Sequence, residues 1–347
     1  MIKLFEGDTA DELWREAAEA LVYGDDFLRQ DSRSGPIREY LHCSFHLKNP
    51  IQRWILSRQP SINPAFAIAE VVWILQGRND AAFPNYWNPK LPEFAGRGVT
   101  YSGAYGQRLR SNLGFDQIES AYQALAADPD SRQVVMQIWD GQKDMPNLDG
   151  TPRGPDIPCN VVAMLKVRGD KLEWLQIMRS NDIFRGTPHN IVQFTCLQEV
   201  MAGWLGLEVG SFVLITDSLH LYEHDVGEFY IAKAAPPAAN TDSLSLPKNE
   251  FDQVLLAMGA AMDELRSEKL LPRRFMEVIA NKNLPESWLN LLRIVAADAA
   301  RRRNWKDEAD TASSRCSNPA LKTAWYAWLD RCKSRELNHL IPITKTS

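Results

Sequence analysis

Cysteine is scarce in this chain of 347 residues, and the five cysteines, at positions 43, 159, 196, 316 and 332, follow no regular spacing. An odd number at such spacing does not fit a disulfide framework or a CxxC metal site. The chain also lacks any run near the roughly 20 apolar residues that a membrane span needs. Its start, MIKLFEGDTADELW, has no basic segment followed by an apolar one, as a signal peptide would. These absences predict a protein of the reducing cytoplasm (of a host cell if the chain is phage-encoded) that uses no metal and touches no membrane.

A surplus of positive charge is missing as well. The formal net charge is −5, with a pI of about 5.8, so bulk binding of nucleic acid is not expected. A local basic pocket remains compatible with this balance. The hydrophobic share of 45% and the charged share of 24% are ordinary for a globular protein. The length allows one large domain, or one domain with an appendage.

Hydrophobic periodicity predicts a mixture of helices and strands, an α+β fold. The pair Thr9 and Glu12 matches a capping box at the start of a helix. A second helix, over residues 64–77, is apolar apart from Glu70. A buried carboxylate is costly unless it is paired or used, so Glu70 is either functional or on the one wetted stripe of its helix.

The middle of the chain alternates between the two element types. The remaining elements that we expect are a strand over 37–47, a helix over 116–127, a strand over 132–139, a hairpin over 160–178, a helix over 189–204, a short strand over 211–216 and a helix over 219–233.

Composition changes near residue 235. The segment AAPPAANTDSLSLP resembles a linker, and only helical patterns follow it, from about 250 to 333. We therefore expect one domain over residues 1–235 and an all-helical extension over 236–347. The arginine run 301–303 within it is either a solvated helix end or a contact surface.

The chemistry-bearing residues concentrate between Ile157 and His224. This run holds Cys159 in IPCN, the motif MRSNDIFRGTPHNI and the closing segment DSLHLYEHD. A thiol, several cations, an amide, an imidazole and a phenol together suit an enzyme that attacks an anionic small molecule with sulfur. Each piece is weak alone, but the order Pro-Cys, Arg-Ser-x-Asp-x-x-x-Gly-x-Pro-x-Asn-Ile and His-x-Tyr is restrictive.

In this order of motifs the sequence resembles the thymidylate synthase family, which includes the pyrimidine-nucleotide hydroxymethylases. The resemblance covers roughly residues 10–235 and includes AEVVWILQG, YSGAYGQRLR and DPDSRQVVMQIWD. It implies a large mixed sheet with packed helices in a catalytic domain over 1–235. It also implies a homodimer that transfers a one-carbon unit from 5,10-methylenetetrahydrofolate to C5 of a pyrimidine nucleoside monophosphate.

The resemblance assigns catalytic roles by position. Cys159 matches the nucleophile that adds to C6 of the base, and nearby Arg179 is expected to lower the pKa of its thiol. Glu70 matches a carboxylate that manages protons through ordered water. Tyr105 and Asn160 complete the catalytic set that we expect.

Further matching positions bind the nucleotide. Arg33, Arg179 and Ser180 match groups that hold the 5′-phosphate, for which the planar fork of arginine is suited. Arg132 matches an arginine that reaches the phosphate from the other subunit of the dimer. Asn190 matches the base-reading amide, which donates to one edge atom of uracil and accepts from N3–H.

The sugar and the folate complete the set of contacts. His220 and Tyr222 match the pair that bonds the 3′-hydroxyl of the sugar. Asp182 matches a residue that serves both the base and the folate. For the cofactor site the remaining candidates are Glu70, Trp87 and Tyr105, where Trp87 and Tyr105 would form walls.

Departures from the family pattern bear on the reaction. This chain has Asn160 where the family has a histidine, Gln133 for an arginine, His189 for a phenylalanine and Arg185 for an apolar residue. It also has Asp217, Ser218 and Leu219 in place of the Gly-Asp pair that precedes the sugar-binding histidine. The short apolar tail that closes the site of methylating members is replaced by helical sequence. A polar, less closed pocket admits water, which yields a hydroxymethyl group, whereas hydride transfer in a dry pocket yields a methyl group.

The most favoured activity is therefore conversion of dUMP to 5-hydroxymethyl-dUMP. The alternatives are dTMP synthesis and hydroxymethylation of a cytosine nucleotide, which Asn190 disfavours. A cysteine hydrolase built on Cys159 and His220, or a scaffold that only binds nucleotide, would leave other members of the set unexplained. The sequence leaves the choice between ribo- and deoxyribonucleotide open.

Overall fold

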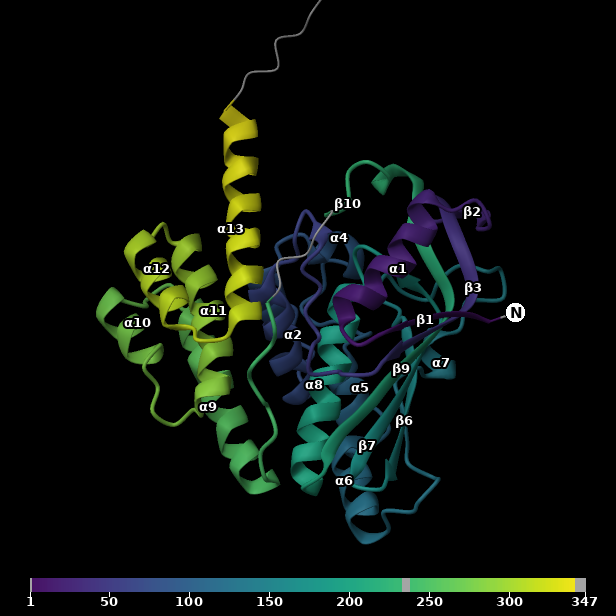
Figure 1. Ribbon diagram of the computed structural model, residues 1–347, viewed down its shortest axis with the longest axis horizontal. Helices are drawn as coiled ribbons and strands as arrows, with labels where there is room; N and C mark the ends of the chain where they lie inside the picture. The colour runs from purple at the N-terminus through teal and green to yellow at the C-terminus, as the bar shows by residue number, and fades with distance from the viewer. Residues whose placement is uncertain (1, 233–237, 341–347) are drawn as a thin grey trace, which may run out of the picture.

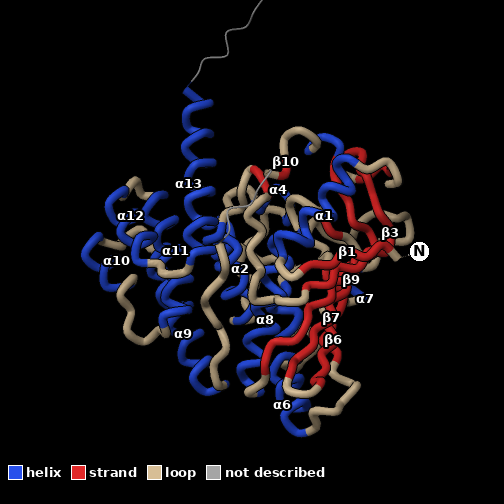
Figure 2. The backbone as a smooth tube through the Cα atoms, viewed as in Figure 1, coloured by secondary structure: helices blue, strands red, loops and turns tan. Residues whose placement is uncertain are grey.

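The structure is a computed structural model that describes residues 2–232 and 238–340 (Figure 1). A twisted sheet lies at one side of the molecule, a layer of helices packs against it, and a second group of helices lies beyond that layer (Figure 2). This arrangement confirms the expected α+β class with a large mixed sheet and a helical C-terminal part. The helices are α1 (Ala10–Tyr23), α2 (Pro64–Leu75), α3 (Ala82–Trp87), α4 (Leu91–Ala95), α5 (Tyr105–Arg110), α6 (Gln117–Ala127), α7 (Gly141–Asp144), α8 (Thr187–Leu205), α9 (Lys248–Arg266), α10 (Pro272–Val278), α11 (Glu286–Arg302), α12 (Lys306–Arg315) and α13 (Pro319–Leu340).

The main sheet has the strand order β1-β3-β9-β7-β6-β5, with β2 paired to β3 and β8 paired to β9. The short strands β4 and β10 form a separate ladder. The strands are β1 (Lys3–Gly7), β2 (Leu28–Ser32), β3 (Gly35–Leu47), β4 (Arg58–Gln59), β5 (Val135–Gln137), β6 (Asn160–Arg168), β7 (Lys171–Met178), β8 (Asn181–Asp182), β9 (Glu208–Tyr222) and β10 (Tyr230–Ile231).

Local sequence explains where the main helices begin and end. The Thr9–Glu12 capping box is present at the start of α1. Asn63 caps α2 by accepting a hydrogen bond from the Ala65 amide, and α2 begins on a proline. Gly206 ends α8 in the left-handed conformation, with φ of 67°. The helix that carries Glu70 and the helix that carries Asn190 are thus defined locally.

The sequence-based expectation was wrong for residues 219–233. Strand β9 continues to Tyr222, and the 3-10 turn Glu223–Asp225 and the short strand β10 follow it. The reason is tertiary, because β3 and β8 both pair with this end of β9 and satisfy its backbone groups. The strand expected over 132–139 is also shorter than predicted. Within that range the strand is β5 (Val135–Gln137), which pairs with β6.

One face of the main sheet is left open by the described helices, which gather on the other face (Figure 2). On the covered face lie buried residues such as Leu165, Trp174 and Phe212. On the open face an apolar band crosses the strands through register neighbours. The band comprises Val135, Met164, Leu175 and Val213 in one row and Val162, Ile177 and Ile215 in the next.

The helical extension is fastened to the rest of the chain by the segment 240–246. The Asn240 amide and carbonyl bond the Gln52 side chain, at 2.8 and 3.0 Å. Glu199 in α8 accepts from the Leu244 amide at 2.8 Å. On the other side, Asn290 of α11 donates to Asp242 at 3.1 Å. The predicted boundary at residue 235 falls outside the described residues and stays a prediction.

The arginine run at the end of α11 is used inside the chain. Arg302 donates to the Trp87 carbonyl at 2.6 Å, and Arg303 donates to the Tyr86 hydroxyl at 2.5 Å. The extension therefore holds α3 in place against α2. Among the described residues, no helix combines the length and the apolar character that crossing a membrane would require.

Candidate active site

Cys159 stands directly before β6, where Arg179 clamps the backbone. The Arg179 amide donates to the Cys159 carbonyl at 2.9 Å. Its guanidinium donates to the carbonyls of Pro158 and Ile157, at 3.0 and 3.2 Å, and lies over the Trp139 ring at 5.4 Å. The predicted neighbours Cys159 and Arg179 are thus brought together by the pairing of β6 with β7.

Burial raises the pKa of the Cys159 thiol above its usual value. Arg179 and, more weakly, Arg33 lower this pKa, whereas Asp156 and Asp182 raise it. The lowering of this pKa by Arg179 is as expected, but loss of hydration around the thiolate outweighs it, so the net direction is upward. Burial thus favours the protonated thiol over the thiolate.

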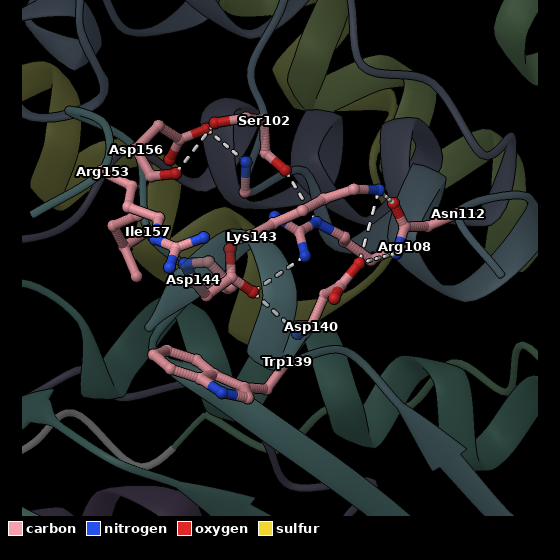
Figure 3. A network of polar contacts seen from close by, with 12 residues as sticks. Ser102, Arg108, Asn112, Trp139, Asp140, Lys143, Asp144, Arg153, Asp156 and Ile157 are labelled. Carbon is pink, nitrogen blue, oxygen red and sulfur yellow. Dashed lines mark hydrogen bonds and ion pairs between the residues drawn. The ribbon is translucent and has the colours of Figure 1, made fainter. Parts of the chain in front are cut away.

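A buried polar network holds the loop that leads to Cys159 (Figure 3). Arg108 and Asp144 form a two-pronged ion pair with both distances 2.8 Å, and both side chains are almost fully buried. Arg108 also donates to the Ser102 carbonyl at 2.7 Å. This pair ties α5, which begins at Tyr105, to the loop after β5.

Asp156 closes the same network next to the cysteine and was missed by sequence reasoning. Its carboxylate accepts from the Gly103 amide at 2.6 Å, and its carbonyl accepts from the Ser102 hydroxyl at 3.0 Å. A Cβ at Gly103 would meet this carboxylate at 2.8 Å, so glycine is needed for the contact. Burial raises the pKa of Asp156. The only available signal was its place three residues before Cys159.

Amide side chains form one wall beside the cysteine. Asn160 donates to Asn190 at 3.4 Å and accepts from Gln176 at 3.0 Å, and Asn190 donates to Asn181 at 3.1 Å. Burial raises the pKa of Tyr105, and contact with Asn160 opposes that rise. Three of the predicted residues, Asn160, Asn190 and Tyr105, are therefore neighbours. Gln176 and Asn181 were not predicted.

Glu70 faces His189 across the gap between α2 and α8. Their Oε2 and Nδ1 atoms are 3.2 Å apart, and the His189 ring packs edge-on against Phe66. Both atoms are buried, and neither makes a hydrogen bond within the described residues. Glu70 is the one residue of α2 that is not fully buried, and it lies next to the histidine that replaces the usual phenylalanine.

Pairing of β8 with β9 sets Asp182 opposite His220. One Asp182 oxygen accepts from the amides of Phe184 and Arg185, at 2.8 and 2.7 Å. The other oxygen, like His220 Nδ1, is buried without a hydrogen-bond partner among the described residues. Burial raises the pKa of Asp182, while His220 opposes that rise. The Tyr222 ring lies 5.2 Å from the His220 ring.

Arg185, expected as part of a polar pocket, is engaged elsewhere. Its Nε donates to the fully buried Asp225 at 2.8 Å. Much of its charge is thereby neutralised within the chain. His189 and Asn160 are left as the polar replacements that contact other predicted site residues.

The remaining predicted residues lie at the edges of this group. Arg33 is exposed in the turn between β2 and β3, and Ser180 is half-buried beside Arg179. Arg132 is exposed before β5. Trp87 is only 1% exposed, so its ring offers little open surface, and its role as a cofactor wall stays a prediction. Within residues 2–232 and 238–340, no three His, Cys, Asp or Glu side chains gather as metal ligands.

Comparison with known proteins agrees with this arrangement. The thymidylate synthase family model matches residues 45–257, which is more than half of the chain. Deoxyuridylate hydroxymethyltransferase of Bacillus phage SP01 is 37% identical over 234 residues, covering 64% of this chain and 60% of the phage protein. The proteins of that name from Pseudomonas phage M6 and Delftia phage PhiW-14 are 31% and 28% identical over 217 and 206 residues. These alignments cover 61% and 56% of this chain.

The chain spans between 56% and 60% of the length of these curated relatives. The matched region runs from β3 into α9, and it contains Cys159, the amide wall and the Glu70–His189 pair. The chain belongs to the thymidylate synthase family.

Proposed function

We propose that this chain converts dUMP to 5-hydroxymethyl-dUMP with 5,10-methylenetetrahydrofolate as co-substrate. The observation that carries the proposal is the setting of Cys159, a partly buried cysteine near the charges of Arg33 and Arg179 and beside an amide wall that includes Asn190. The relatives named deoxyuridylate hydroxymethyltransferase support the choice of substrate and product.

Binding of the nucleotide would use three groups of residues. The guanidiniums of Arg33 and Arg179, with the Ser180 hydroxyl, would hold the 5′-phosphate. His220 and Tyr222 would bond the sugar hydroxyl. Asn190 would read the base. Its amide is kept from rotating freely because it accepts a hydrogen bond from Asn160, which in turn accepts one from Gln176.

The sulfur of Cys159 would then act as the nucleophile. Its thiolate adds to C6 of uracil, and C5 gains the electron pair with which it forms the new carbon–carbon bond. Loss of the C5 proton and of the folate amine would leave an exocyclic methylene at C5. Addition of water to this methylene, followed by departure of the sulfur from C6, would restore the aromatic ring. Because burial raises the pKa of the thiol, deprotonation of Cys159 is a step that the site must assist.

The residues lining the site fit a folate beside the nucleotide. Asp182 keeps a buried carboxylate oxygen without a hydrogen-bond partner in the described chain, and Glu70 Oε2 faces His189 Nδ1 without a hydrogen bond, so both oxygens could accept from the polar edge of a pterin. Glu70, Asp182 and, as a wall, Trp87 would hold the folate, which supplies a carbon at the oxidation level of formaldehyde. Glu70 and His189 would also orient a water molecule for the final addition, which gives the hydroxymethyl group.

The test is incubation of the purified chain with dUMP, dCMP, UMP or CMP and methylenetetrahydrofolate. We expect a dUMP product heavier by CH2O, without the absorbance of dihydrofolate and absent with Cys159→Ala. A product heavier by CH2, with dihydrofolate, would make the chain a thymidylate synthase. Reaction of a cytosine nucleotide alone would overturn the choice of base. Nucleotide binding without turnover would indicate a scaffold.

We further propose a homodimer joined through the open face of the sheet. The apolar band there, with Val135 49% exposed, is a surface that a second copy would cover. Arg132 is exposed at the adjoining end of β5 and would reach the phosphate in the second copy's site. Mixing inactive Cys159→Ala and Arg132→Ala chains should restore about a quarter of the activity, because half the dimers then hold one intact site. A monomer by light scattering would contradict the proposal.

A further inference from the structure

Five buried side chains behind the site form one continuous row of hydrogen bonds. Trp174 Nε1 donates to Gln176 Oε1 at 3.1 Å, and Gln176 Nε2 donates to Asn160 Oδ1 at 3.0 Å. Asn160 Nδ2 donates to Asn190 Oδ1 at 3.4 Å, and Asn190 Nδ2 donates to Asn181 Oδ1 at 3.1 Å. All five residues are at most 7% exposed. We refer to this row as the amide relay.

The indole at one end gives the relay its direction. An indole N–H can only donate, so Gln176 must turn its carbonyl oxygen toward Trp174 and its amino group toward Asn160. Each amide has one donor group and one acceptor, so the orientation of Asn160 follows from that of Gln176. The orientation of Asn190 then follows from that of Asn160.

The other end of the relay would favour the opposite direction. Asn181 Nδ2 is buried and makes no hydrogen bond within the described residues. If every amide were reversed, Asn181 Nδ2 would donate to Asn190 Oδ1 and would no longer lack a partner. The Gln176 amino group would then face the Trp174 N–H, so that two donors would meet without an acceptor. The observed direction is therefore held by the Trp174 N–H, in a buried setting that strengthens each bond.

Gly186 leaves room for the end of the relay. A Cβ there would lie 3.2 Å from Asn181 Oδ1 and 3.4 Å from Asn190 Nδ2. Its φ of −87° is open to any residue, so the reason for glycine is space and not backbone conformation. The site thus keeps Asn190 and Asn181 at hydrogen-bond distance.

We propose that Trp174 is a positioning residue that makes the site choose uracil over cytosine, by setting which way Asn190 presents its amide. Uracil offers a donor at N3 and an acceptor at O4, whereas cytosine offers an acceptor at N3 and a donor at its amino group. An asparagine amide can pair with either edge, but the two pairings require opposite orientations. This inference rests on the proposed function, in which Asn190 reads the base.

Replacing Trp174 by phenylalanine removes the indole N–H and keeps an aromatic ring. The matched control is Trp204→Phe, because the Trp204 indole N–H is also buried but has no hydrogen-bond partner in the described chain. For Trp174→Phe we expect the ratio of kcat/KM for dUMP to that for dCMP to fall about tenfold, the factor carried by one buried hydrogen bond. Trp204→Phe should keep the wild-type ratio.

A second variant, Gln176→Met, conserves volume but removes the link between Trp174 and Asn160, and it should shift the ratio in the same direction. The ratio of the dissociation constants for dUMP and dCMP, measured by calorimetry, gives the same readout without turnover. Wild-type chain that binds dUMP but makes no product would defeat the proposed function alone. If folded variants of Trp174 and Gln176 keep the wild-type preference for dUMP over dCMP, the proposed role of Trp174 is wrong. A wild-type preference for dCMP would also overturn it.

Discussion

A carboxylate in the helical extension and one in the active site have different hydrogen-bond surroundings. In the extension, Asp298 is fully buried and is bonded by Arg301 at 2.9 Å and by Arg302 at 2.7 Å. In the site, Glu70 and His189 each keep a buried atom without a hydrogen-bond partner in the described chain. The buried carboxylate of Asp298 is therefore satisfied within the chain, whereas Glu70 and His189 keep atoms available to a ligand.

This difference has an energetic meaning. A buried donor or acceptor without a partner costs about 1–3 kcal/mol, so a surface built only for stability would pair it. Buried groups without hydrogen bonds in the candidate site indicate that binding is served at the expense of stability. Changes in the site should therefore affect activity more than stability, and changes in the extension should do the reverse.

The largest expected effect is on the activity of Cys159→Ala. Turnover of dUMP should fall roughly ten-thousandfold or more, because no other group can form the bond to C6. The midpoint of thermal unfolding should change little, since the sulfur makes none of the hydrogen bonds found in the described chain. Release of tritium from C5 of dUMP measures the step directly. Cys332→Ala, half-buried in α13, is the control, and an equal loss there would contradict the comparison.

Glu70→Gln should lower kcat by roughly a hundredfold to ten-thousandfold, the range of a group that transfers protons. Binding of dUMP alone should be nearly unchanged, because the proposed nucleotide contacts do not include Glu70. Steady-state kinetics and calorimetry measure the two quantities separately. Glu93→Gln, exposed on α4, is the matched control. Loss of dUMP binding in Glu70→Gln would show that the carboxylate is structural.

Asp298→Ala should act on stability. Removing the carboxylate leaves two partly buried guanidiniums, Arg301 and Arg302, without their common partner, which should lower the free energy of unfolding by about 3 kcal/mol. Denaturant unfolding measures this change. Asp310→Ala, exposed on α12, should leave stability unaltered. The comparison fails if Asp298→Ala keeps its stability but loses kcat.

The smallest expected effect concerns the reactivity of Cys159 as a function of pH. The thiolate is the reactive form, and burial raises the pKa of this thiol in the folded chain. Alkylation of Cys159 by iodoacetamide should therefore be slow at neutral pH and keep rising beyond the pH at which an ordinary thiol levels off. Arg179→Gln should slow it several-fold further at a given pH, because Arg179 lowers the pKa. Peptide mass spectrometry measures the alkylation of Cys159. If the midpoint of its pH dependence lay below that of the denatured chain, the expectation would be contradicted.

Local sequence signals were sufficient for the helices that carry the site. The apolar run after Asn63 and the proline-to-glycine span of α8 define their own limits, so α2 and α8 were predicted within a few residues. The segment 219–233 was mispredicted, because its strand conformation depends on partners far away in the chain. Periodicity over so few residues could not reveal that pairing.

The candidate site divides in the same way. The order of motifs identified Cys159, Arg179 and Asn190, since the resemblance rests on residue types at set spacings. It could not reveal Asp156 or Gln176, whose roles arise from contacts with Gly103 and Asn160 across separate elements. Nor could it predict the direction of the Cys159 pKa, because burial is a property of the folded chain.

The sequence by itself thus determined the α+β class and the family resemblance, and it singled out Cys159 as the proposed nucleophile, because these depend on composition, short-range periodicity and motif order. Only the tertiary structure decided how the extension is fastened, which polar groups stay unpaired and which way the Asn190 amide points. Each of those depends on which side chains from distant parts of the sequence come into contact. In a buried setting a donor needs an acceptor, so the partner that an amide finds sets the orientation of that amide.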